Sequence, residues 1–110
     1  MRKFHLKRGE RKLFLQKIAA NLVMRGRMET TEARAKEIRP LIERMISISK
    51  RQNLSALRSL IKELPKKAAA KLYYEIGPRY KERRGGYLRI TKLAKFRKRD
   101  GARMAVIEFV

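Results

Sequence analysis

The sequence predicts an α+β fold in which about four helices pack on a small sheet with a C-terminal antiparallel β-hairpin. Helical hydrophobic periodicity runs from Glu10 to about Ile76, and after Pro78 it gives way to strand-like alternation. A length of 110 residues is typical of one domain. We therefore expect a basic, extended N-terminal arm over residues 1–9 and a single domain over residues 10–110.

The first helix is expected to begin at Glu10, and Gly26 stands where a left-handed glycine would end it. Its apolar face combines two adjacent rows with a spacing of four residues: Phe14, Ile18 and Leu22, and Leu15, Ala19 and Val23. The next five residues, 27–31, favour a brief strand, with Thr30 or Thr31 capping a second helix.

The second helix is expected from Glu32 to about Ser49, with a kink or a break at Pro40, which lacks an N–H. Asn53 or Ser55 begins a third helix, whose apolar residues are Leu57, Leu60, Ile61 and Leu64. A fourth helix is expected from Lys66 to about Ile76, with Pro65 before it and Gly77-Pro78 as its end.

The last quarter of the chain has the pattern of a hairpin. Gly85-Gly86 interrupts the regular secondary structure, and from Tyr87 to about Ala94 apolar and polar residues alternate as in a strand. Asp100-Gly101 is a turn signal before a second strand, Met104–Val110. Residues 95–99 would form a cationic hairpin end, and the segment near Met28 is a candidate third strand. Helices must cover one face, because two strands alone are marginally stable.

Composition excludes several classes of protein. The chain carries 31 Lys and Arg against 10 Asp and Glu, a formal charge of +21, yet 44% of its residues are hydrophobic, enough for a core. Such a charge opposes compaction unless a polyanion neutralises it. The absence of cysteine excludes disulfides and thiolate chemistry. No apolar run is long enough for a membrane span, and no secretory signal pattern follows the basic N-terminus.

The residues that could carry catalysis are few and poorly placed for it. Glu32, Glu37 and Glu43 stand beside cations on the second helix, where local ion pairing is the expected role. His5 is the single histidine and lacks nearby metal co-ligands. No phosphate-binding glycine motif is present. We therefore expect no enzyme activity, no cofactor, no metal site and no small-molecule substrate.

The cations gather in two segments. Residues 1–27 hold nine Lys and Arg against one acid, and residues 79–103 hold eleven against two, whereas residues 28–64 hold eight against five. Lys and Arg neutralise phosphates, and Tyr and Arg planes stack on exposed bases. The candidate nucleic-acid-binding residues are Arg2, Lys3, Lys7, Arg8, Arg11 and Lys12 in the first segment, and Arg79, Tyr80, Lys81, Arg83, Arg84, Tyr87, Arg89, Lys95, Arg97, Lys98 and Arg99 in the second.

Certain ordered motifs are more specific than charge. They are Gly77-Pro78-Arg79-Tyr80, Arg84-Gly85-Gly86-Tyr87 with Arg89, Asp100-Gly101-Ala102, Met104-Ala105-Val106-Ile107-Glu108, Gly26-Arg27-Met28-Glu29-Thr30-Thr31 and Ala35-Lys36-Glu37-Ile38-Arg39. In this order they resemble the bacterial large-subunit ribosomal protein seventeen family, from Arg11 onward. The N-terminus is shorter than that family's arm and carries His5 differently, so no arm contact is carried over.

The resemblance implies a structural constituent of the large ribosomal subunit in the cytoplasm. It implies binding to the 23S ribosomal RNA near the rim of the polypeptide exit tunnel, beside neighbouring large-subunit proteins, with no membrane and no catalysis. The cations alone leave an alternative open, a sequence-neutral DNA-binding protein of the chromosomal type.

Overall fold

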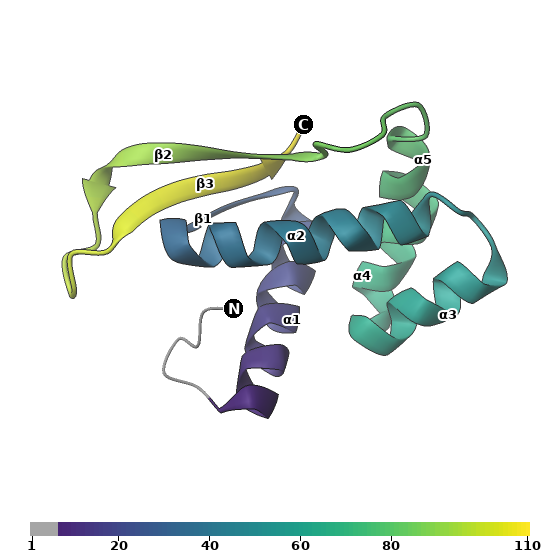
Figure 1. Cartoon of the computed structure of the whole chain (residues 1–110), viewed down its shortest axis with the longest axis horizontal. Helices are drawn as coiled ribbons and strands as arrows, with labels where there is room; N and C mark the ends of the chain where they lie inside the picture. Colours follow the sequence, from purple (N-terminus) through teal and green to yellow (C-terminus); the bar gives the residue numbers. More distant parts are fainter. Residues whose placement is uncertain (1–6) are drawn as a thin grey trace.

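The computed structural model describes residues 7–110, and the six residues before them lie outside the description (Figure 1). It confirms the predicted α+β class. The elements in order are α1 (Arg8–Arg25), β1 (Arg27–Thr31), α2 (Glu32–Ser49), α3 (Leu54–Glu63), α4 (Lys66–Lys71), the π-helical turn η1 (Leu72–Ile76), α5 (Gly77–Arg79), β2 (Leu88–Phe96) and β3 (Arg103–Phe109).

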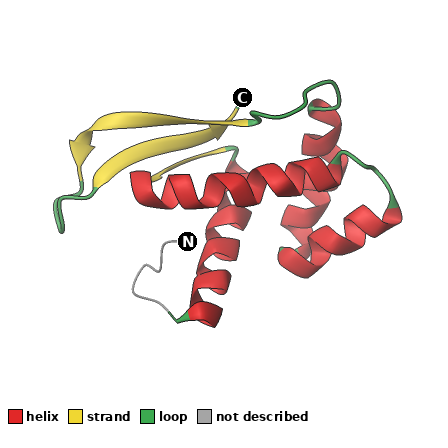
Figure 2. Cartoon of the chain, viewed as in Figure 1, coloured by secondary structure: helices red, strands yellow, loops and turns green. Residues whose placement is uncertain are grey.

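The three strands form one antiparallel sheet in the order β1-β3-β2, so the candidate strand near Met28 is confirmed. Met28 lies opposite Ile107 on β3, and Ile90 of β2 lies opposite the same residue from the other side. The helix α2 runs along one face of the sheet, α1 and α4 cross beneath α2, and the far end of the β2–β3 hairpin projects past the start of α2 (Figures 1 and 2).

The core lies around α2, between the sheet and the other helices. Ile38, Ile42 and Ile46 repeat every four residues along α2 and are fully buried. They belong to one cluster that includes Leu72 of η1 and Ile107 of β3. A helix whose apolar stripe meets a sheet on one side and helices on the other buries that stripe completely. The rest of the fold is arranged about this helix.

Several predicted boundaries are confirmed by their local chemistry. Gly26 ends α1 in the left-handed conformation with φ at 83°. The Thr31 side chain accepts a hydrogen bond from the backbone N–H of Arg34, and the Asn53 side chain accepts one from Ala56. Each cap satisfies an N–H that has no partner inside the first turn of its helix.

Two helices differ from the predictions, α1 in where it begins and α2 in its continuity. The helix α1 begins at Arg8, so the last residues expected in the arm form its first turn. The helix α2 is continuous through Pro40, so of the predicted kink or break the break is wrong. Pro40 is exposed, so the carbonyl that loses its N–H partner there lies on the solvent side, where water can bind it.

The fourth helix does not end at Gly77-Pro78 as predicted. It continues through η1 and α5 to Arg79, and Gly77 is helical with φ at −54°. The Gly77 N–H donates to the carbonyl of Leu72, five residues back. This wider turn precedes Pro78, whose missing N–H and ring would disturb an ordinary α-helical turn. On α3, Ile61 is 41% exposed, whereas Leu60 is buried in the core.

Candidate nucleic-acid interface

The segment between α5 and β2 is tied to the end of the chain by two hydrogen bonds. The Tyr80 hydroxyl donates to the backbone carbonyl of Val110 at 2.6 Å. The Val110 N–H in turn donates to the carbonyl of Tyr87 at 2.9 Å. The two tyrosine rings lie 5.3 Å apart between their centroids. The loop that carries the second cationic segment is therefore anchored at both ends.

Lys50 provides a third anchor for the same loop. This residue caps the C-terminus of α2, and its ammonium group donates to the Tyr87 hydroxyl at 2.9 Å and to the backbone carbonyl of Arg83. The ammonium nitrogen also lies 5.1 Å from the centroid of the Tyr87 ring, within range of a cation–π contact. Sequence reasoning missed this role, because Lys50 lies in an ordinary helical segment far from the loop in sequence.

These anchors leave a group of cations facing solvent. We call Arg79, Lys81, Arg83 and Arg84 the loop surface; all four are exposed, and Glu82 is the one acid within this stretch. A loop whose backbone is fixed presents its charges in a set arrangement, so less ordering is needed when a polyanion binds. The predicted second cationic segment thus includes a preformed, net positive surface.

Tyr80 and Tyr87 do not belong to that surface. Tyr80 is 5% exposed and Tyr87 is 1% exposed, and both belong to the hydrophobic core cluster. Neither ring can stack on a base in this structure, which corrects their predicted role. Their hydroxyl groups are the polar parts that reach hydrogen-bond partners, as buried tyrosines require.

Further along the segment, three predicted RNA-binding cations are paired with acids of the chain itself. Arg89 lies 2.8 Å from Glu108, and Lys95 lies 2.6 Å from Glu29 across the sheet. Arg97 donates to Asp100 at 2.9 Å, and this contact holds the pKa of the Asp100 carboxyl well below its ordinary value. The Ala102 N–H, which donates to the same carboxylate, lowers that pKa further. Lys98 and Arg99 are exposed at the hairpin tip.

The first cationic segment lies elsewhere on the molecule. Lys7, Arg8 and Lys12 are exposed at the N-terminal end of α1, and Arg11 is half-buried beside them. This end of α1 and the loop surface lie on opposite sides of α2 (Figure 1). Arg2 and Lys3, which were also predicted to bind, are outside the described residues. The structure therefore separates the two predicted clusters.

Comparison with known proteins decides the family. Residues 14–110 match the family model of Ribosomal protein L17. The chain is 43% identical over 109 residues to large ribosomal subunit protein bL17 of Persephonella marina, with 97% of this chain and 88% of that protein covered. It is 47% identical over 103 residues to bL17 of Moorella thermoacetica, with 93% and 91% covered. The chain belongs to the ribosomal protein L17 family.

The described part of this L17-family chain holds no cluster of metal-binding side chains and no membrane-spanning helix. Within residues 7–110, no group of three or more His, Cys, Asp or Glu side chains is placed to hold a metal ion. His5, the one histidine, lies before that range. No helix in the described part of the chain is long and apolar enough to cross a membrane. The local ion pairs expected on α2 include Lys36 with Glu32 at 2.9 Å and Arg39 with Glu43 at 3.8 Å.

Proposed function

We propose that this protein is a structural constituent of the large ribosomal subunit in the cytoplasm, where it binds 23S ribosomal RNA and stabilises the RNA fold during translation. Its relatives in Persephonella marina and Moorella thermoacetica are large ribosomal subunit proteins. The protein's role is to hold RNA segments together, without a chemical step.

The loop surface is the observation that carries this proposal. It presents four exposed cations on a backbone held by Lys50, Tyr80 and Tyr87. RNA segments that approach one another repel through their phosphates, and fixed cations between them reduce that repulsion. The exposed cations at the N-terminal end of α1 form a second point of contact on the other side of α2.

The finer placement rests on the family resemblance. We infer that the protein sits near the rim of the polypeptide exit tunnel, beside other large-subunit proteins. Sedimentation tests the assembly itself: the full chain is expected to migrate with large subunits through moderate salt. Chemical crosslinking within those subunits then tests the location, because proteins of the tunnel rim should be captured. Free protein at the top of the gradient contradicts the assembly.

The RNA-binding part of the proposal is tested by salt dependence. Binding of the full chain to fragments of large-subunit ribosomal RNA should weaken steeply with salt, each neutralised phosphate adding roughly 0.7–0.9 to the log–log slope. A slope equivalent to one or two phosphates contradicts the proposal. Duplex DNA serves as competitor at one salt concentration. A preference for the duplex favours the alternative, a sequence-neutral DNA-binding protein.

Two variants of equal charge show whether the loop surface is responsible. The first replaces Arg79, Lys81 and Arg84 of the loop surface by Gln. The second replaces three other exposed cations by Gln, namely Arg58 on α3 and Lys66 and Lys67 on α4. Both lose three charges, so a purely global effect of net charge would weaken binding equally. We expect the first variant to lower the slope by about two units, and the second by clearly less. Equal losses contradict the loop surface as the contact.

A further inference from the structure

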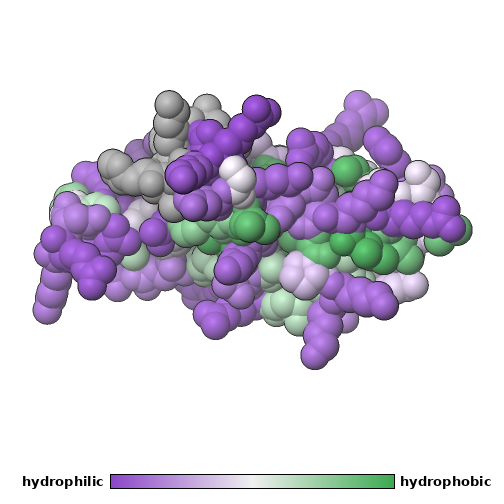
Figure 3. Space-filling model, turned by 90° about the horizontal axis from the view of Figure 1, so that it is seen from below, coloured by the Kyte–Doolittle hydropathy of each residue, from purple (hydrophilic) through white to green (hydrophobic). Residues whose placement is uncertain are grey.

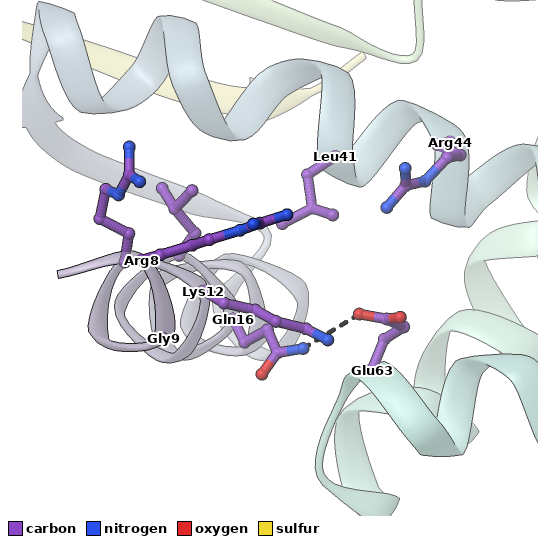
Figure 4. Close-up of a pocket in the computed structure, with 9 residues that line it drawn as sticks. Arg8, Gly9, Lys12, Gln16, Leu41, Arg44 and Glu63 are labelled. Carbon is purple, nitrogen blue, oxygen red and sulfur yellow. Dashed lines mark hydrogen bonds between the residues drawn. The ribbon is translucent and has the colours of Figure 1, made fainter. Parts of the chain in front are cut away.

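A groove on the far side of the molecule from the loop surface joins three helices. Its volume is about 780 Å³, and its lining comes from the start of α1, the middle of α2 and the end of α3. Figure 4 shows Arg8 and Lys12 on α1, Leu41 and Arg44 on α2, and Glu63 on α3 around this space. We call it the α1–α3 groove. Its volume falls within the range of roughly 300–1,000 Å³ that is usual for small-ligand sites.

The groove is strongly cationic. Arg8, Arg11, Lys12 and Arg44 line it, against Glu63 as its one acid. Glu63 accepts a hydrogen bond at 3.0 Å from the Gln16 side-chain amide, drawn as a dashed line in Figure 4. Like charges around one space repel, and the repulsion is relieved when an anion enters. The occupant should therefore carry negative charge.

Arg11 gives a second, independent sign of a missing partner. Its Nε–H is buried and has no hydrogen-bond acceptor among the described residues. Buried donors in folded proteins almost always have an acceptor, because an unpaired donor loses its hydrogen bonds to water without replacement. Because Arg11 lines the groove, a small turn of its guanidinium group would bring this donor to an acceptor bound there.

The groove also has an apolar floor. Leu15 is 6% exposed and Leu41 is half-buried, and both line the space beneath the cations. Figure 3 shows the lower face of the molecule, where hydrophobic residues form a strip bordered by hydrophilic ones. A simple phosphate ion would leave such a floor uncovered. The occupant therefore combines an anionic group with a body that can lie on aliphatic side chains.

We propose that the α1–α3 groove receives a single unpaired nucleotide of RNA. Its phosphate would pair with the guanidinium groups of Arg11 and Arg44, and its base would lie on Leu15 and Leu41. This inference rests on the proposed function, which supplies the RNA, and it adds the site and the state of the nucleotide.

Photocrosslinking tests the site with the full chain unaltered. Large-subunit ribosomal RNA is prepared with a photoreactive analogue of each of the four nucleosides in turn, and the crosslinked peptides are identified by mass spectrometry. We expect peptides of the groove, containing Leu15 or Leu41, crosslinked at an unpaired nucleotide. RNA crosslinks confined to residues 79–99, or groove crosslinks only at base-paired nucleotides, contradict the inference and leave the proposed function standing. If the chain forms no RNA crosslinks at all, both the groove site and the proposed RNA-binding function are contradicted.

A matched pair of variants tests the chemistry. Arg44→Gln and Arg58→Gln each remove one exposed cation from a helix, and only the first lies in the groove. We expect Arg44→Gln to weaken RNA binding about tenfold, the effect of losing one charge-assisted hydrogen bond, and to abolish the groove crosslinks. Arg58→Gln should keep them. If an acidic protein segment fills the groove instead, groove crosslinks are absent and the two variants weaken RNA binding equally.

Discussion

Gly77 packs against Ser49 so closely that a β-carbon on Gly77 would lie 2.7 Å from the Ser49 hydroxyl oxygen. The same β-carbon would lie 3.1 Å from the backbone carbonyl of Leu72. Ser49 is fully buried and donates to the carbonyl of Ile46 at 2.7 Å, so its side chain has little freedom to move away. The end of α2 and the start of α5 thus meet where glycine fits without displacing its neighbours.

This contact predicts that Gly77→Ala destabilises the fold. The added methyl group must displace Ser49 or the backbone, at a cost of about 1–3 kcal/mol. Thermal and denaturant unfolding measure the loss. Introducing Gly77→Ala into a Ser49→Ala background should cost less, because the hydroxyl oxygen is then absent. Gly9→Ala is the control, since a β-carbon there meets nothing within 4 Å. Equal stability of Gly77→Ala and wild type would contradict the contact.

The turn before β2 depends on Gly86 rather than on its neighbour. Gly86 has φ at +63°, whereas Gly85 is not among the glycines with positive φ. A β-branched residue is strained in the left-handed region, so Gly86→Val should lose about 1–2 kcal/mol of stability. Gly85→Val in the same turn should lose clearly less, since its β-carbon would meet nothing within 4 Å. The reverse order in urea unfolding would contradict the left-handed conformation of Gly86.

The Tyr80 hydroxyl is expected to contribute to stability through its bond to Val110. Tyr80→Phe keeps the buried ring and removes the donor, so it should cost about 1 kcal/mol. Tyr74→Phe is the matched control, because Tyr74 is 65% exposed and its hydroxyl can bind water in either state. Denaturant midpoints of the two variants give the comparison. No difference between them would argue against the anchor at the C-terminus.

Acid should weaken the hairpin tip. The folded state lowers the pKa of Asp100 below its ordinary 3.8, so its stabilising effect is complete above that pH and declines as the pH falls further. Asp100→Asn keeps an acceptor for Ala102 but loses the ionic contact with Arg97. Melting temperatures from pH 5 downward should therefore converge for wild type and variant. A gap that stays constant to the lowest pH would rule out this contact.

The sequence was most informative where local chemistry decides structure. The caps at Thr31 and Asn53 and the left-handed Gly26 follow from side chains within a few residues of each other. The strand near Met28 was harder to predict, because its pairing with β3 depends on residues almost eighty positions away. At Pro40 a local rule was misleading. Proline usually disrupts a helix, but Pro40 is exposed, and the buried apolar residues of α2 keep the helix continuous.

The candidate site was less predictable than the fold. Charge clustering indicated which segments carry the cations, but it could not separate paired from unpaired ones. Arg89 and Lys95 look like Arg84 in sequence, yet they are bound to Glu108 and Glu29 across the sheet. Tyr80 and Tyr87 were grouped with the cations because they alternate with them, although tertiary packing places both rings in the core. The role of Lys50 depends entirely on that packing.

The acids that pair with the cations of β2 have a consequence for the hairpin of the isolated chain. Glu29 with Lys95, Glu32 with Lys92 and Glu108 with Arg89 join parts of the chain that are distant in sequence. Exposed ion pairs of this kind contribute little stability, and the backbone pairing of β3 with β1 and β2 holds the strands together. The hairpin therefore has its shape within the isolated chain, and these acids neutralise some of its cations while others, such as Lys98 and Arg99, stay exposed.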